Sequence, residues 1–133
     1  MKPAPLKEVI KKQYLMCAKD PAYFMKKYCM VQHPMKGKVP FHLYEYQEKS
    51  LQTFEDHRFN IILKARQLGL STLTAGYSLW MMTFHQDKNI LVIATKQDTA
   101  KNLVTKVRVM HANLPSWLKN ICVEDNKLSL RYK

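Results

Sequence analysis

Apolar residues along this chain follow two spacings, which predict strands that alternate with helices. Residues 59–63 and 90–93 are short, mainly apolar runs rich in β-branched side chains and without regular polar alternation. Such runs are typical of parallel strands that are covered on both faces. After the first run, large apolar side chains are spaced by four, three and four positions, which places them on one helical face. They are Leu73, Tyr77, Trp80 and Phe84.

A second helix is expected after the second run. Thr95, with Asp98 three positions later, resembles a capping box. An apolar stripe follows at Leu103, Val104, Val107, Met110 and His111. The order strand, loop, helix, strand, helix predicts an α/β fold with a parallel sheet and right-handed crossovers.

Residues 1–40 are predicted to form a helical N-terminal region with a connecting loop, ahead of a domain at residues 41–133. Residues at helical spacing predict the first helix. Asp20 and Pro21 suit the N-cap and the first position of a second helix. The second helix is expected to continue through Met30 and Val31. Two prolines and Gly37 indicate a loop or short extended arm over residues 33–40. The residues at helical spacing in the first helix are Leu6, Val9, Ile10, Gln13, Tyr14 and Cys17.

The C-terminal residues predict a hairpin. Residues 125–127 read as a turn, and Leu128, Leu130 and Tyr132 alternate beyond it. Glu124 and Asp125 are the only candidates in the sequence for a catalytic pair of carboxylates at the end of an apolar strand. We reject them, because the residues after them predict a hairpin.

The chain is strongly basic, with 22 Lys and Arg against 10 Asp and Glu, a formal net charge of +12. Residues 1–40 hold nine basic and two acidic side chains, and so contribute +7 of this excess. A basic surface attracts polyanions through counterion release, which suits a partner such as DNA. A solvated basic face with no partner is the alternative.

Cysteine and histidine usage gives no sign of a metal site or a disulfide framework. The three cysteines are odd in number and lack paired spacing, and the five histidines are scattered. No stretch is apolar enough to span a membrane, and early lysines interrupt any signal-peptide core. A reducing cytoplasm is the expected compartment.

The strongest chemical signal is the loop at residues 64–72, between the first apolar run and the helix after it. The usual phosphate-binding pattern G-x-x-x-x-G-K-[ST] combines a glycine turn, free backbone N–H groups, a lysine and a hydroxyl for magnesium. Gly69 and Ser71 hold their places here, whereas Leu70 replaces the lysine and Lys64 stands where the first glycine would be. Anions favour such a helix N-terminus. The alternative is an ordinary turn with Ser71 as N-cap.

Upstream, Gln47 lies close to aromatic residues in the stretch 41–47. A carboxamide can both donate to and accept from the N6/N7 edge of adenine, while a ring packs against the base. The alternative is that Tyr44, Leu51 and Phe54 are helix core contacts and that Gln47 faces solvent.

Together these pieces resemble the N-terminal ATPase portion of the large terminase subunit of tailed bacteriophages, the motor that packages DNA. The resemblance runs from about His33 to Tyr132 and rests on short segments in the same order. They are residues 33–34, 41–47, 66–69, 93–96 and 114–118.

The resemblance implies a P-loop NTPase-type domain that binds ATP and Mg²⁺. Gln47 matches the adenine-contacting glutamine, Ser71 the magnesium hydroxyl, and Arg66 an arginine that stabilises the γ-phosphate. Lys64 takes over the essential cation, as in terminases with the lysine at the start of the loop, so Lys64 and Arg66 are the expected catalytic residues. The expected nucleotide-binding residues are Gln47, Lys64, Ala65, Arg66, Gln67, Leu68, Gly69, Leu70, Ser71 and Thr72.

Thr95 and Lys96 match a segment that touches the nucleic acid backbone in related translocases, and an ordinary helix cap with a solvated lysine is the alternative. The implied partners are double-stranded DNA, the portal protein, the small terminase subunit and further copies in a ring, at the procapsid portal in the host cytoplasm. In the family the acidic strand follows the hairpin, so the sheet is expected to be incomplete and the chain to stop inside its domain. Two alternative functions remain: a helicase-like translocase fragment, and a non-catalytic basic DNA-binding or regulatory fragment.

Overall fold

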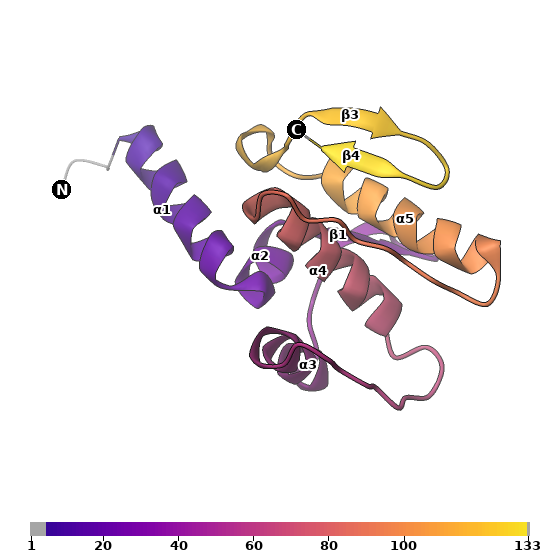
Figure 1. Ribbon diagram of the computed structural model, residues 1–133. Helices are drawn as coiled ribbons and strands as arrows, with labels where there is room; N and C mark the ends of the chain where they lie inside the picture. The colour runs from indigo at the N-terminus through magenta and orange to yellow at the C-terminus, as the bar shows by residue number, and fades with distance from the viewer. Residues whose placement is uncertain (1–4, 133) are drawn as a thin grey trace.

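The computed structural model describes residues 5–132, and helices carry most of its architecture (Figure 1). The helices are α1 (Leu6–Lys19), α2 (Pro21–Tyr28), α3 (Glu45–Asp56), α4 (Leu70–Phe84) and α5 (Gln97–Ala112), with a short 3-10 turn at Ser116–Leu118. The strands are β1 (Met30–His33), β2 (Gly37–Pro40), β3 (Cys122–Asp125) and β4 (Leu130–Tyr132). Within the described residues, no helix is long and apolar enough to cross a membrane.

Helix α4 is the centre of the core and contacts α2, α3 and α5. Leu73 and Leu79 are completely buried, and Trp80 is nearly so. A helix that is apolar on most faces is stable only when other elements surround it. The hydroxyls of Thr74 and Ser78 donate to the carbonyls four residues earlier, so these two side chains are also satisfied.

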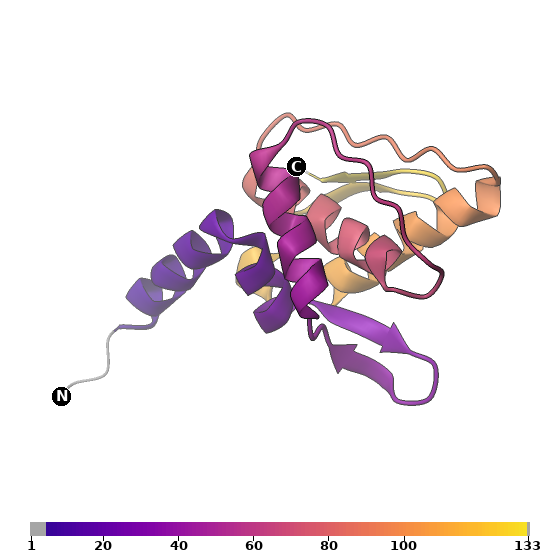
Figure 2. The same cartoon turned by 90° about the horizontal axis from the view of Figure 1, so that it is seen from below.

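The N-terminal helices form largely as predicted. The Asp20 carboxylate accepts a hydrogen bond from the Ala22 amide at 2.8 Å, and Pro21 is the first residue of α2. The predicted continuation of α2 through Val31 is wrong, because β1 begins at Met30 and pairs with β2 in an antiparallel hairpin. Figures 1 and 2 show α1 projecting from the body, and the Trp80 indole N–H donates to its Cys17 carbonyl at 2.8 Å.

The predicted parallel sheet is wrong for the described residues, and so is the P-loop NTPase-type fold class that rested on it. Both sheets are two-stranded antiparallel hairpins, β1 with β2 and β3 with β4. Residues 59–63 and 90–94 are extended and run in the same direction as each other, opposite to that of α4 (Figures 1 and 2). Neither segment makes a backbone–backbone hydrogen bond with another described residue. An apolar run specifies burial, whereas a strand also needs a partner backbone about 4.8 Å away.

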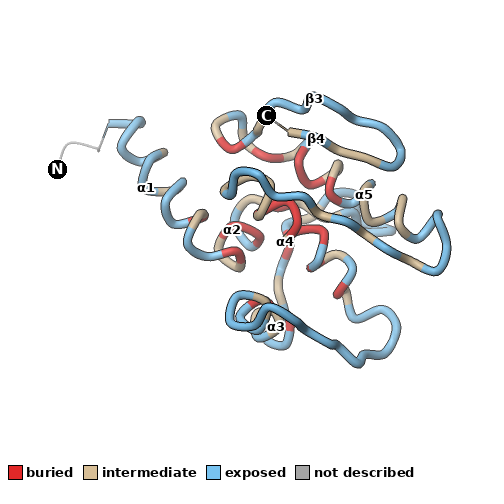
Figure 3. Tube along the Cα trace, viewed as in Figure 1, coloured by how far each residue is buried: buried red, intermediate tan, exposed pale blue. Residues whose placement is uncertain are grey.

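Residues 59–63 are exposed although they are mainly apolar, and residues 90–94 alternate between half-buried and exposed positions (Figure 3). Ile61 and Leu63 are fully exposed, and Leu91 and Ile93 are 83% and 86% exposed. Isolated apolar side chains on a surface are common, but a continuous apolar stretch with a free backbone is not.

The starts of α4 and α5 differ from the predictions. Gly69, in the left-handed conformation, is the N-cap of α4, so Ser71 is not the cap. Lys96 is the N-cap of α5 and no side chain caps this helix, so the capping box of Thr95 and Asp98 is wrong. The buried stripe of α5 is confirmed at Val107, Met110 and His111.

The C-terminal hairpin is confirmed, with Cys122 opposite Tyr132. The Asn126 side-chain oxygen accepts from the amides of Leu128 and Ser129, which fixes the turn. Arg108 of α5 forms an ion pair with Asp125 at 2.5 Å. The hairpin therefore packs on α5 through a defined polar contact.

Candidate functional site

The loop before α4 has an unusual backbone. Gly69 has φ +69° and Gln67 has φ +62°. Gly69 suits this left-handed conformation, whereas a glutamine adopts it at a cost of roughly 1–2 kcal/mol. Such local strain is concentrated at functional sites, where surrounding contacts maintain it.

The amide groups that open α4 are not used by the protein. In the described residues, the N–H groups of Gly69, Leu70, Ser71 and Thr72 donate to no backbone or side-chain acceptor, and the first amide with a partner is that of Leu73, to the Gly69 carbonyl at 2.9 Å. Free N–H groups and the positive end of the helix dipole form a ready anion site.

Two residues of α3, Tyr46 and Gln47, form hydrogen bonds with the loop. Gln47 is only 2% exposed, and its Nε2 donates to the Leu68 carbonyl at 3.3 Å while its Oε1 accepts from the Tyr44 amide at 3.0 Å. The Tyr46 hydroxyl donates to the same Leu68 carbonyl at 2.7 Å. Gln47 therefore does not face solvent, and its side chain links the start of α3 to the loop by hydrogen bonds.

Gln47 keeps some hydrogen-bonding capacity, because a carboxamide has two N–H donors and two oxygen lone pairs and each end uses one. The rings of Tyr44 and Tyr46 stack beside it, with centroids 5.6 Å apart. Adenine recognition by Gln47 thus stays a prediction, and it would have to coexist with the loop contact.

A cavity of about 570 Å³ adjoins this loop. Gln47, Gly69 and Thr72 line it together with the β1–β2 hairpin and α5, and its lining within residues 5–132 holds no Asp or Glu. Among these lining residues Lys106 of α5 is the one lysine, and its ammonium donates to the Thr72 hydroxyl at 3.3 Å. The cavity therefore has an apolar wall and a basic end at the first turn of α4.

Lys106 was missed by the sequence analysis. It is exposed on α5, 34 positions after Thr72. Only the packing of α5 against α4 brings the two together. A lysine without a motif gives no sequence signal for this position.

The predicted cations of the loop lie differently. Lys64 is exposed, and its ammonium donates to the carbonyl of its neighbour Ala65 at 3.2 Å, so it is not directed at the free amides. Arg66 is exposed and forms no ion pair with a described residue. Both lie on the loop with Ala65, Gln67 and Leu68, which are also exposed.

Residues 70–72 divide between core and surface. Leu70 is buried, so the position that carries lysine in the usual motif here anchors the helix in the core. Ser71 is exposed on the first turn, as a magnesium-binding hydroxyl would need to be. Within the described residues no cluster of three His, Cys, Asp or Glu side chains could hold a metal ion.

Thr95 and Lys96 are exposed directly before α5. The starts of α4 and α5 lie at the same end of the molecule, as Figures 1 and 2 both show. The predicted DNA-contacting residues are thus on the same side as the loop. Glu124 and Asp125 belong to the C-terminal hairpin, where Glu124 accepts a hydrogen bond from the Asn126 side chain and Asp125 accepts one from Arg108.

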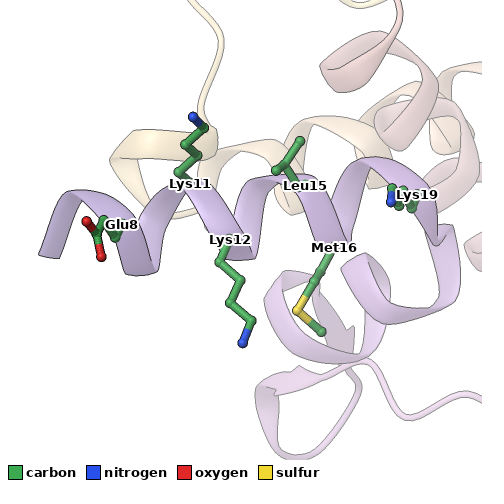
Figure 4. Close-up of a pocket in the computed structure, with 6 residues that line it drawn as sticks. All are labelled: Glu8, Lys11, Lys12, Leu15, Met16 and Lys19. Atoms are coloured by element: carbon green, nitrogen blue, oxygen red, sulfur yellow. The ribbon is translucent and has the colours of Figure 1, made fainter. Parts of the chain in front are cut away.

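The exposed side of α1 is a second basic feature. Figure 4 shows Lys11, Lys12 and Lys19 beside Leu15 and Met16, all from this one helix. Their side chains point in different directions, so the feature is an open helix surface without a wall opposite it.

The thiols and phenols with shifted pKa values belong to the core. Burial raises the pKa of the Cys17 thiol to about 11, and burial also raises that of Cys29. Burial, followed by a hydrogen bond with Glu55, raises the pKa of Tyr77. Buried thiols with raised pKa values are poor nucleophiles, which assigns these cysteines a structural role.

No protein-family model matches this chain. The likeness to large terminase subunits therefore rests on the residues named in the sequence analysis.

Proposed function

We propose that this chain binds ATP at the start of α4 and serves as the nucleotide-binding part of a terminase-like motor that moves double-stranded DNA into a viral procapsid. The observation that carries the proposal is the set of free amides from Gly69 to Thr72, beside a cavity with Lys106 at its basic end. The ordered likeness of the short segments to terminases supplies the biological context.

The chemistry divides among a few groups. The amides would hold the β- and γ-phosphates, and the Lys106 ammonium would neutralise phosphate charge from the side of α5. The Ser71 hydroxyl would hold Mg²⁺, and the metal would supply positive charge against the phosphates. Lys64 and Arg66 would act from the exposed side of the loop, and they would have to reorient to do so.

Hydrolysis needs a carboxylate that orients or activates water. No carboxylate lines the cavity in the described part of the chain. The proposal therefore assigns ATP binding to this chain and hydrolysis to the complete motor.

Calorimetric titration with Mg-ATP tests the site. A charged hydrogen bond contributes about 1.5–3 kcal/mol, so we expect Lys106→Ala to weaken ATP binding by about tenfold or more. Ser71→Ala and Lys64→Ala should also weaken it. Lys12→Ala on α1 is the matched control, since it removes an exposed lysine from a helix that does not line the cavity. Unchanged affinity in all three site variants would reject the assignment.

A basic nucleic-acid-binding fragment without turnover is the second candidate. The net charge of +12 and the lysines on α1 favour it. It predicts DNA binding that falls steeply with salt and is indifferent to ATP. A helicase-like translocase would instead separate strands without a procapsid.

A further inference from the structure

The loop before α4 is attached to the rest of the molecule through one backbone group. In the described part of the chain, the Leu68 carbonyl is the only backbone group of residues 64–68 that bonds to another element. It accepts from the Tyr46 hydroxyl at 2.7 Å and from Gln47 Nε2 at 3.3 Å. A carbonyl oxygen has two lone pairs, so both are used. The Leu68 carbonyl is therefore fixed toward α3, and its shorter bond comes from Tyr46.

A fixed Leu68 carbonyl also fixes the direction of the Gly69 amide. The two groups belong to one peptide unit, which is trans. In a planar trans peptide the C=O and N–H bonds point in opposite directions, so the Gly69 N–H points away from its α3 donors. Rotation of this peptide by half a turn would put an oxygen where the N–H is now, and that oxygen would repel an anion.

The loop backbone needs such an anchor, because one of its residues is unfavourable. Gln67 has φ +62°, a left-handed conformation that destabilises the loop unless other contacts offset its cost. The Tyr46 ring is held in place for this role by stacking on Tyr44, with centroids 5.6 Å apart and 8° between the ring planes. Loss of the Tyr46 hydroxyl therefore removes the stronger of the two bonds that oppose relaxation of the loop.

We propose that Tyr46 is a positioning residue for the phosphate site: its hydroxyl holds the Leu68–Gly69 peptide so that the Gly69 N–H stays available to an anion. Tyr46 acts through the loop, since it is not among the described residues that line the cavity. The inference rests on the proposed function, because the anion is the phosphate group of the nucleotide. It adds a control of that site that comes from α3.

Tyr46→Phe tests this role, because it removes the hydroxyl and keeps the ring. In NMR spectra of the ligand-free chain, the carbonyl carbon resonance of Leu68 should shift, since this oxygen loses its shorter hydrogen bond. Titrations should show that the affinities for Mg-ATP and for inorganic pyrophosphate both fall by about fivefold. A shared loss for the two ligands assigns the effect to the amides that hold phosphate.

Tyr77→Phe is the matched control. It also removes one hydroxyl hydrogen bond between α3 and α4, because the Tyr77 hydroxyl donates to the Glu55 carboxylate. Tyr77 is not among the described cavity-lining residues. This variant should lower the unfolding temperature while it leaves the Leu68 resonance and both affinities unchanged, so it distinguishes positioning of the loop from general stability.

Two results would overturn the positioning role alone, in a chain that binds Mg-ATP. One is an unchanged Leu68 carbonyl resonance in Tyr46→Phe, and the other is an equal loss of affinity in Tyr46→Phe and Tyr77→Phe. Failure of the wild-type chain to bind either Mg-ATP or pyrophosphate would overturn the proposed function together with this role. The two failures are therefore distinguishable.

Discussion

Helix α4 and the extended segments at 59–63 and 90–94, called here the open segments, are similarly apolar, yet α4 lies in the core and the open segments lie largely at the surface. Leu73 and Leu79 of α4 are completely buried, whereas Ile61 and Leu63 are fully exposed. A helix satisfies its backbone internally and needs neighbours only for its side chains. An extended segment needs a neighbour both for its backbone hydrogen bonds and for its side chains. The same apolar pattern therefore gives a buried helix at α4 and unpaired backbone in the open segments.

The sharpest test of this contrast compares two truncations of similar size. Leu79→Ala should cost about 2–5 kcal/mol of unfolding free energy, because it leaves a cavity in the core. Ile61→Ala should change it by no more than about 0.5 kcal/mol, since the side chain is fully exposed. Urea unfolding of both variants measures the difference. A large cost at Ile61 would mean that this segment is covered in solution.

Two glycines with the same φ angle allow the cost of backbone strain to be distinguished from the cost of a steric clash at the loop. Gly37 and Gly69 both have φ +69°, but a Cβ at Gly37 meets nothing within 4 Å, while one at Gly69 would lie 2.7 Å from Gln47 Nε2. Gly37→Ala should cost about 1 kcal/mol from conformation alone. Gly69→Ala should cost about 2–3 kcal/mol, because the Gln47 contacts must also shift.

Denaturant midpoints of both glycine variants give these values. Gln47→Ala should reduce the additional cost of Gly69→Ala in a double-mutant cycle. Equal costs at the two glycines would show that Gln47 does not hold the loop.

The same contrast explains how far the sequence predicts the structure. The helices at 6–19, 70–84 and 97–112 follow from local apolar spacing, and the C-terminal hairpin from alternation and a turn. The parallel sheet was wrong because strand pairing depends on distant backbone, on which a local pattern carries no information. Gly69 and Ser71 identified the loop, whereas Lys106 could be found only from the packing of α5 on α4.

His111 tests the boundary between the core and the C-terminal hairpin through pH. Burial lowers its pKa below 6.5, opposed by a hydrogen bond with the Asn120 carbonyl and by Asp125, and assisted by Lys119. The unfolded chain therefore binds a proton more readily than the folded one. The contribution of His111 to the unfolding free energy is therefore fully present above about pH 6.5, and it is lost as the pH falls through the folded pKa.

Thermal unfolding between mildly acidic and neutral pH should show this loss in the wild-type chain. His111→Gln should flatten the dependence over the same interval. An unchanged slope in that variant would place the titrating group elsewhere.

The smallest change in unfolding free energy is expected for a substitution at Tyr132, the last residue of β4. Its ring stacks on His111 with centroids 4.2 Å apart, but its hydroxyl is buried and has no hydrogen-bond partner among the described residues. Tyr132→Phe keeps the stacking and removes the unsatisfied group, so the unfolding free energy should rise by up to about 1 kcal/mol. A decrease, measured by urea unfolding, would show that the hydroxyl has a partner in solution and that this end of the molecule is packed like the core.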